Sequence, residues 1–393
     1  MVRSISLWIL AAIILSTAPP ARGAEPIEIA AVGPFTGGSA PMGTSMLDGI
    51  KLAVAEINRA GGVLGRPIVL LERDDKAKNE AGARIGRELT VKHPVVAAVG
   101  LVNTGVTLAA APYFEQARIP LMVSVATGSL ITRQFAPPEY RENYIFRLSA
   151  STTVEVAMIT EQVIRQRFKK VAVLADTTRY GQVGRQDLVA ALAQDGITPV
   201  SIEKFNIGDI NMAEQLRRAR DAGAEVILTY GIGPELARIA RDRATLGWKV
   251  PIIGAWTLSM SNFIDIAGPS GEGAVMPQTF IQEGNTPKRQ AFISAFRTAY
   301  GLARMPSPPS AAQGYDSIYV LAAAIEQAGS TEGPKIREAL DHLEKPVEGV
   351  VKTYDHPFNP KDHDAISRAD VVFGIVKNGR VVRLVSLSLL GSH

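Results

Sequence analysis

Short runs of apolar, β-branched residues alternate along the chain with longer segments whose apolar residues recur every three or four positions. The first pair is the run IEIAAVG at 27–33 followed by residues 44–60, where Met46, Ile50 and Ile57 fall on one face of a helix. The run at 27–33 is apolar at almost every position, which is typical of a strand buried on both faces. Such alternation predicts a parallel sheet covered by helices on both sides.

The same alternation occurs twice along the chain. The first series predicts strands at 67–72, 95–100 and 119–124, with helices at 79–91 and from Thr104 onward. After a polar, proline-containing stretch at 133–143, the second series predicts strands at 170–176, near 200, at 225–231 and at 250–255, with helices at 182–194, 211–222 and 235–246. Helices at 288–300 and 310–329 and a hairpin turning at Asn378-Gly379 complete the chain. The expected fold class is therefore α/β, with two doubly wound, Rossmann-like lobes.

Two copies of one architecture imply two lobes with chain crossings between them. We expect the first lobe to comprise residues 24–145 and 277–345, and the second lobe residues 146–276 and 346–393. Three crossing segments, near 146–148, 275–279 and 350–354, would form the hinge. The length suits two domains of ordinary size.

The N-terminus has the layout of a secretory signal peptide. Arg3 precedes the apolar stretch at 7–15, and small residues at 21–23 predict cleavage near Gly23. The apolar stretch is shorter than the roughly 20 residues that cross a bilayer. We therefore expect residues 1–23 to be removed and the protein to reside in a bacterial periplasm.

Composition narrows the class of protein further. The formal charge is +4 for the whole chain and falls to +2 without Arg3 and Arg22, so no basic surface for nucleic acid is expected. The sequence contains no cysteine, so it has neither disulfides nor a thiol for lipid attachment. We expect a freely diffusing protein stabilised by buried apolar area.

Several motifs, in order, resemble one family. They are GPFTG at 33–37, the segment DGIKLAVAEINRAGGVLGRPIVLLERDD at 48–75, VGLVNTG at 99–105, SVATG at 124–128 and DTTRYG at 176–181. Together they resemble the periplasmic binding proteins of the branched-chain amino acid type, the type I receptors of ABC importers. The resemblance spans essentially the whole mature chain. It implies a non-enzymatic, cofactor-free protein that binds a small carboxylate between closing lobes and delivers it to a membrane permease with its ATPase. A monomer is expected, although the sequence does not determine the oligomeric state.

Two corners at strand ends are the expected carboxylate site. At the first corner, the Thr104 hydroxyl and the N–H groups of a helical first turn lie where partial positive charge favours an anion. The second corner, residues 124–127, adds backbone N–H groups and the Thr127 hydroxyl. In relatives both corners hold the carboxylate. The expected ligand-binding residues of the first lobe are Asn103, Thr104, Ser124, Val125, Ala126 and Thr127. Helix capping alone would also explain Thr104 and Thr127.

The second lobe contributes residues at the carboxyl ends of its strands, where open α/β sheets bind ligands. We expect Tyr180, Tyr230, Ile232 and Trp256 to cover the ligand, although each aromatic residue could instead belong to the core. Relatives that bind amino acids place a carboxylate at or near the position of Trp256. A buried ammonium without a partner costs several kcal/mol, so the resemblance favours an aromatic or keto acid over a branched-chain amino acid.

An acidic side chain reaching the cleft from elsewhere would reverse that preference. Asp176 and Glu235 are the candidates that the sequence offers, because both lie near strand ends of the second lobe. With either of them in the cleft, an ordinary amino acid would fit.

Other chemistry has weaker support in the sequence. Gly231-Ile232-Gly233 lacks the third glycine of a dinucleotide fingerprint, so NAD is not expected. The residues Asp355, His356, Asp362, His363 and Asp364 match no metal-site spacing and are interpreted as a solvated connection. The pattern places His93 in a buried segment, and no nucleophile elbow is present, so no catalytic residue is expected. A periplasmic sensor of the same fold, and an exported enzyme, remain alternatives.

Overall fold

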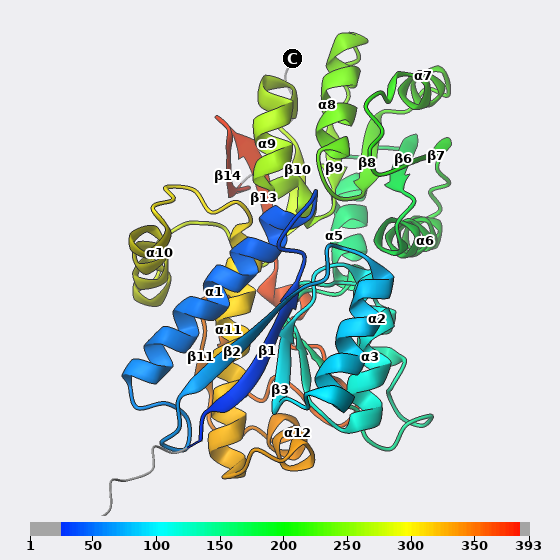
Figure 1. Cartoon of the computed structure of the whole chain (residues 1–393). Helices are drawn as coiled ribbons and strands as arrows, with labels where there is room; N and C mark the ends of the chain where they lie inside the picture. Colours follow the sequence, from blue (N-terminus) through cyan, green and yellow to red (C-terminus); the bar gives the residue numbers. More distant parts are fainter. Residues whose placement is uncertain (1–24, 386–393) are drawn as a thin grey trace, which may run out of the picture.

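The computed structural model describes residues 25–385 (Figure 1). The predicted leader at 1–23 lies outside these residues. The first sheet is parallel, in the order β2-β1-β3-β4-β5. Its strands are β1 (Ile27–Gly33), β2 (Ile68–Asp74), β3 (Ala97–Gly100), β4 (Leu121–Val123) and β5 (Ile145–Arg147).

Helices cover both faces of the first sheet, as the uninterrupted apolar run of β1 predicts. Ile27 and Ile29 face the core that includes α1 and α11, whereas Ala30 and Val32 face the core that includes α3. Figure 1 shows α1 and α11 on one side of the sheet and α2 and α3 on the other. The helices are α1 (Ala40–Arg59), α2 (Asn79–Arg87), α3 (Thr104–Ala117), α4 (Leu130–Arg133), α10 (Pro287–Tyr300), α11 (Pro308–Ala328) and α12 (Gly333–Asp341), with a π-helical turn at Glu88–Lys92.

The second sheet runs in the order β14-β13-β10-β9-β8-β6-β7. Its strands are β6 (Val171–Asp176), β7 (Ser201–Phe205), β8 (Val226–Tyr230), β9 (Ile252–Gly254), β10 (Val275–Gln278), β13 (Val372–Lys377) and β14 (Arg380–Arg383). The helices of this lobe are α5 (Thr152–Arg165), α6 (Arg179–Gln194), α7 (Ala213–Asp221), α8 (Glu235–Thr245) and α9 (Ser261–Ala267), with 3₁₀ turns at Trp256–Ser259, Gly268–Gly271 and Arg368–Asp370. The predicted α/β class with two lobes is confirmed.

The predicted hairpin is present at the sheet edge. β13 and β14 pair antiparallel, and Asn378 and Gly379 adopt φ angles of 52° and 66°. A two-residue turn with positive φ at both positions requires residues that tolerate the left-handed region, which is why asparagine and glycine occupy it. The helix α5 was not among the predicted elements, because its sequence TTVEVAMITEQVIR is rich in β-branched residues of low helix propensity.

The segment at 346–366 lies against the first lobe. Its strands β11 (Val347–Glu348) and β12 (Thr353–Tyr354) pair with each other. The N–H groups of Val350 and Val351 donate to the buried carboxylate of Asp316 on α11, at 2.7 and 2.9 Å. After β12, the chain next joins the second sheet at β13. On these contacts we propose, in place of the expected crossing at 350–354, that 346–366 belongs to the first lobe and that the third crossing follows residue 366.

Two expectations about histidines are also wrong. The His363 ring is buried, stacks on Phe146 with a centroid distance of 4.1 Å, and lies 2.9 Å from Asp341, so this end of the loop is not a solvated connection. His93, in contrast, has 56% of its side chain exposed and pairs with Glu28. Within 25–385, no three potential metal-ligating side chains are grouped together, and no helix there has the length and apolarity that a bilayer crossing needs.

Candidate functional site

The carboxyl ends of the strands in the two lobes face each other across a narrow cleft. A cavity of about 10 Å³ between them is lined by residues from both lobes. The lining residues are Met42, Val102, Asn103, Val125 and Thr127 from the first lobe and Tyr180, Ile232, Trp256 and Thr257 from the second. The structure thus brings together most of the residues predicted from the sequence. A cavity of this size has room for about one water molecule, so a solute enters only if the lobes separate.

The first corner is the start of α3. Asn103 is the N-cap in an extended conformation and its side chain makes no cap hydrogen bond, while Thr104 is the first helical residue. Thr104 Oγ1 is buried and has no hydrogen-bond partner among residues 25–385. Capping therefore does not explain Thr104. Thr104 lines a wider outer cavity of about 830 Å³, which shares Asn103, Tyr180 and Ile232 with the inner cavity.

The second corner, residues 124–128, follows β4 and is held rigidly from behind. The buried guanidinium of Arg147 donates to the carbonyl oxygens of Thr127 and Gly128 at 2.9 and 2.7 Å and forms a bidentate ion pair with Asp364. Ser149 Oγ donates to the carbonyl of Ala126 at 2.8 Å. These bonds leave the Thr127 side chain directed at the cavity, with Oγ1 unpartnered among the described residues.

Two predicted members of this corner do not offer donors to the cleft. The N–H of Ala126 donates to the carbonyl of Leu101 at 3.1 Å, and the N–H of Ser124 donates to that of Gly100 at 2.8 Å. The Ser124 hydroxyl is paired with Ser317. We therefore drop Ser124 and Ala126 from the proposed ligand contacts, because the β3–β4 connection already uses their hydrogen-bonding groups.

Aromatic residues of the second lobe form the opposite wall. The rings of Tyr180 and Tyr230 pack with a centroid distance of 4.9 Å. The Tyr180 hydroxyl and Trp256 Nε1 are buried and lack partners within the described part of the chain. Tyr230 is fully buried and does not line the cavity, and α6 packs closely against its ring at Gly184. Tyr230 is thus a supporting residue rather than a wall residue.

Glu155, which sequence reasoning missed, lies at the same cleft. It sits in the first turn of α5 and lines a second cavity of about 10 Å³ together with Val125, Thr127 and Trp256. Its Oε2 accepts a 2.5 Å hydrogen bond from the Tyr230 hydroxyl, and its Oε1 accepts one from the backbone N–H of Trp256. Burial raises its pKa to about 7, and these hydrogen bonds and the Arg147 charge oppose that rise. A glutamate inside the apolar run VEVAMI was the available signal.

Neither of the two acids that the sequence offered as alternatives lines the two small cavities, but Glu235 lines the wider outer cavity. Asp176, at the end of β6, accepts hydrogen bonds from the N–H groups of Thr178 and Ile232, and burial raises its pKa to about 6. Glu235 Oε1 accepts from the N–H of Gly208, whereas its Oε2 is buried and has no hydrogen-bond partner among residues 25–385. Because the Ile232 N–H already donates a hydrogen bond to Asp176, the Gly-Ile-Gly turn does not present that donor to a dinucleotide phosphate.

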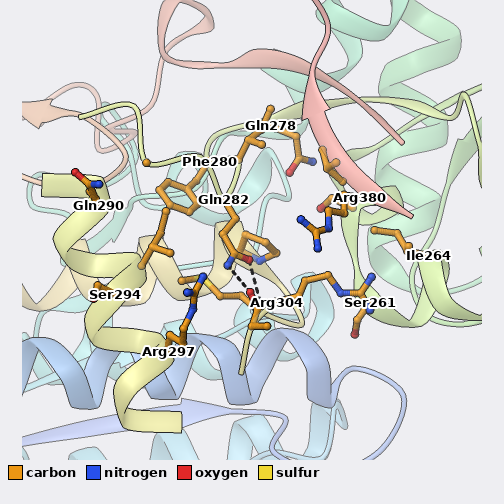
Figure 2. A pocket seen from close by; sticks show the side chains of 18 residues that line it. Ser261, Ile264, Gln278, Phe280, Gln282, Gln290, Ser294, Arg297, Arg304 and Arg380 are labelled. Carbon is orange, nitrogen blue, oxygen red and sulfur yellow. Dashed lines mark hydrogen bonds between the residues drawn. The ribbon is translucent and has the colours of Figure 1, made fainter. Parts of the chain in front are cut away.

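A separate cavity of about 520 Å³ lies between α10, α9 and β14 (Figure 2). Three arginines line it, but Arg304 is paired with Asp265, and Arg297 and Arg380 are exposed. The Gln282 amide is satisfied by the backbone of Ala303 and Met305. Its arginines and Gln282 are paired or exposed, and Ser259 Oγ is its one buried polar group without a partner among residues 25–385, so we place the solute site in the interlobe cleft instead.

Two α/β lobes whose strand ends enclose a shared, donor-lined cleft define a solute-binding protein of the two-lobed type. Residues 26–379 match the family model described as periplasmic binding protein, and the chain belongs to this family. A relative from Brucella melitensis, the Leu/Ile/Val-binding protein homolog 3, is 27% identical over 83% of this chain and 86% of its own length.

Solved structures of similar fold hold different ligands. The substrate-binding protein LivJ from Streptococcus pneumoniae, in complex with isoleucine, has a TM-score of 0.76 and 24% identity, covering 91% of this chain and 100% of that one. A solute-binding protein of an ABC transporter from R. palustris, in complex with benzoate, has a TM-score of 0.78 and 19% identity, covering 91% and 95%. At these identities the likeness concerns the fold.

Proposed function

We propose that this protein is the extracytoplasmic solute-binding component of an ABC importer, that it holds a small carboxylate in the interlobe cleft, and that it is not an enzyme. The observation that carries the proposal is that Thr127, Tyr180 and Trp256 line one small cavity, and that their Oγ1, OH and Nε1 atoms are buried without partners among residues 25–385. Buried donors without acceptors are unfavourable, so three such residues around one cavity favour an anionic ligand there.

The two lobes divide the binding work in this proposal. Thr127 and the first turn of α3 hold the carboxylate in the first lobe, where the helix N-terminus adds partial positive charge. Tyr180 and Trp256 reach the ligand only when the second lobe approaches. The ligand therefore favours the closed arrangement, because only that arrangement makes both sets of contacts. Closure then presents one composite surface to the permease.

The named ligands of similar proteins support a carboxylate. Isoleucine and benzoate, bound to the two solved structures above, share a carboxylate and little else. The proposal carries over only that shared group. Delivery to a permease and ATPase, periplasmic location and a monomeric state belong to the same proposal.

The experiment that tests the proposal is ligand identification followed by titration. Protein purified from the periplasm is denatured, and released small molecules are identified by mass spectrometry. A panel of monocarboxylates is then titrated by calorimetry and by thermal shift, in which a ligand raises the melting temperature with its concentration. We expect one-site binding of an unchanged carboxylate. Chemical conversion of the ligand, or a panel in which only non-acids bind, would contradict the proposal.

A further inference from the structure

Glu155 is an acidic side chain at the cleft without a cationic partner of its own. It is 1% exposed and stands on α5, which runs at the junction of the lobes (Figure 1). Arg147, the buried cation whose charge acts on Glu155, is committed to Asp364 and to two carbonyl oxygens of the second corner. Two neutral donors, from Tyr230 and Trp256, are the hydrogen-bond partners of Glu155 within the described residues.

A carboxylate can accept about four hydrogen bonds, so Glu155 keeps acceptor capacity after these two. Keeping an ionised carboxylate buried with neutral donors alone is unfavourable, and a cation that arrives with the solute would relieve that cost. We infer that Glu155 is the specificity-determining residue of the cleft, and that it selects a carboxylate ligand bearing an ammonium group, namely an α-amino acid. This inference rests on the proposed function.

The spacing of the two recognition groups fits such a ligand. Glu155 and Thr127 line the same small cavity, so the acid that would bind the ammonium stands beside the hydroxyl that would bind the carboxylate. Their relative position is fixed, because the N–H of Thr152, one turn before Glu155, donates to the Thr127 carbonyl at 2.8 Å. In an α-amino acid the two charged groups are attached to one carbon and therefore require neighbouring partners.

This placement changes the ligand preference expected from the sequence. That expectation assumed that an amino acid would find no counter-charge once Trp256 occupied the acid's usual place. The structure places a different acid, from a different element, against the backbone of Trp256 itself. The indole then provides an apolar wall, and the charge comes from α5.

The ionisation of Glu155 gives a second readout. The titratable and charged groups around it are Tyr230 on β8, Tyr180 and Asp187 on α6, and Arg147 on β5. Asp187 accepts a hydrogen bond from the Thr152 hydroxyl. Both tyrosines stay neutral because burial holds their pKa values well above 10. Binding of an ammonium requires the ionised acid, so amino acid affinity should rise as the pH increases through about 7.

The test compares matched ligand pairs by calorimetry: leucine with 4-methyl-2-oxopentanoate, and phenylalanine with phenylpyruvate, plus benzoate. The wild-type protein should bind the ammonium-bearing member of at least one pair at least about 30-fold more tightly. The Glu155→Gln variant, which keeps the shape, should lose that preference and the pH dependence through weaker amino acid binding, and it should bind the keto acid at least as tightly, because the repulsion between two carboxylates is removed. Glu161→Gln is the control, since Glu161 lies on the same helix but faces solvent and pairs with Arg165 and Arg368.

The outcomes separate this inference from the proposed function. Unchanged amino acid affinity in Glu155→Gln overturns the inference. Wild-type protein that binds only keto acids or benzoate also overturns it, and leaves the proposed function standing. If no carboxylate binds wild-type protein and none co-purifies, the proposed function fails and the inference fails with it. Circular dichroism and thermal unfolding of each variant establish that it is folded.

Discussion

The Tyr230 hydroxyl donates a 2.5 Å hydrogen bond to Oε2 of Glu155, and both side chains are almost completely excluded from solvent. The pair joins the end of β8 to the first turn of α5, two elements that are 75 residues apart in the chain. It holds the Glu155 carboxylate at the cleft while Tyr180 packs against the Tyr230 ring. The orientation of the acid therefore depends on a residue that does not line the cavity.

Replacing Tyr230 by phenylalanine removes that donor and leaves the ring in place. The variant should lose about 1–3 kcal/mol of unfolding free energy, since a buried acceptor loses its partner. The pKa of Glu155 should rise further, because a hydrogen bond that lowers it is gone. Urea unfolding measures the first effect, with Tyr113→Phe, at a half-buried tyrosine on α3, as the control. Equal stability of the two variants would contradict the prediction.

Replacing Thr127 by valine should weaken binding of the co-purifying carboxylate by about 1–3 kcal/mol, because a donor to a charged acceptor is lost at constant shape. Folding should change little, since Thr127 Oγ1 makes no hydrogen bond within 25–385. Thr160→Val is the matched control, because Thr160 Oγ1 is also buried and unpartnered but does not line the cleft. Calorimetry showing equal affinity for both variants would remove Thr127 from the site.

Gly184 allows α6 to pack against Tyr230. A Cβ atom at this position would lie 2.0 Å from Tyr230 Cδ1, whereas an ordinary helical Gly→Ala change gains up to about 1 kcal/mol. Gly184→Ala should instead lose about 1–3 kcal/mol through overpacking and should weaken ligand binding by displacing the ring. Gln186→Ala, at an exposed position of the same helix, should alter neither quantity. A higher melting temperature for Gly184→Ala would show that the ring adjusts freely.

Stability should fall as the pH rises from about 5 to about 8. Burial raises the pKa of Glu155 and of Asp75 to about 7, and that of Asp176 to about 6, above their ordinary values of 4.5, 3.8 and 3.8. Between the ordinary and raised values the folded state binds more protons than the unfolded state, so the unfolding free energy decreases with pH and levels off above about 8. Urea unfolding across this range measures the slope.

Glu155→Gln should make that slope shallower and should stabilise the ligand-free protein at pH 8 by about 1–3 kcal/mol, because a buried charge is removed. A slope identical to that of the wild type would mean that the Glu155 carboxylate titrates near its ordinary pKa.

The ion pair between Arg147 and Asp364 fixes the second corner from behind. Arg147 is fully buried, and removing either partner leaves a charge uncompensated, so Arg147→Met and Asp364→Leu should each cost about 3–5 kcal/mol. The double variant should recover part of that loss, which a double-mutant cycle in urea measures. Additive losses would mean that the pair is not coupled.

Sequence periodicity was sufficient for most of the fold, and together with the family resemblance it predicted where the cleft residues lie. The strand at 27–33 and the carboxyl ends carrying Thr127, Tyr180 and Trp256 followed from local pattern and from order along the chain. These features depend on neighbouring residues and on the rule that ligands bind at strand ends in open α/β sheets. Helix α5 did not follow, because its β-branched residues have low helix propensity and packing against the rest of the lobe outweighs that preference.

The sequence by itself determined two α/β lobes and their order, whereas a first-lobe corner suited to a carboxylate stays a prediction. Only the tertiary structure decided which groups remain available to a solute: the β3–β4 connection uses the donors of Ser124 and Ala126, and the first lobe holds the segment that includes Asp364. It also brought Glu155 to Trp256, across a sequence separation of 101 residues. Local pattern reports which face of an element is buried, but the partner of a buried polar group is set by the packing of elements remote in sequence.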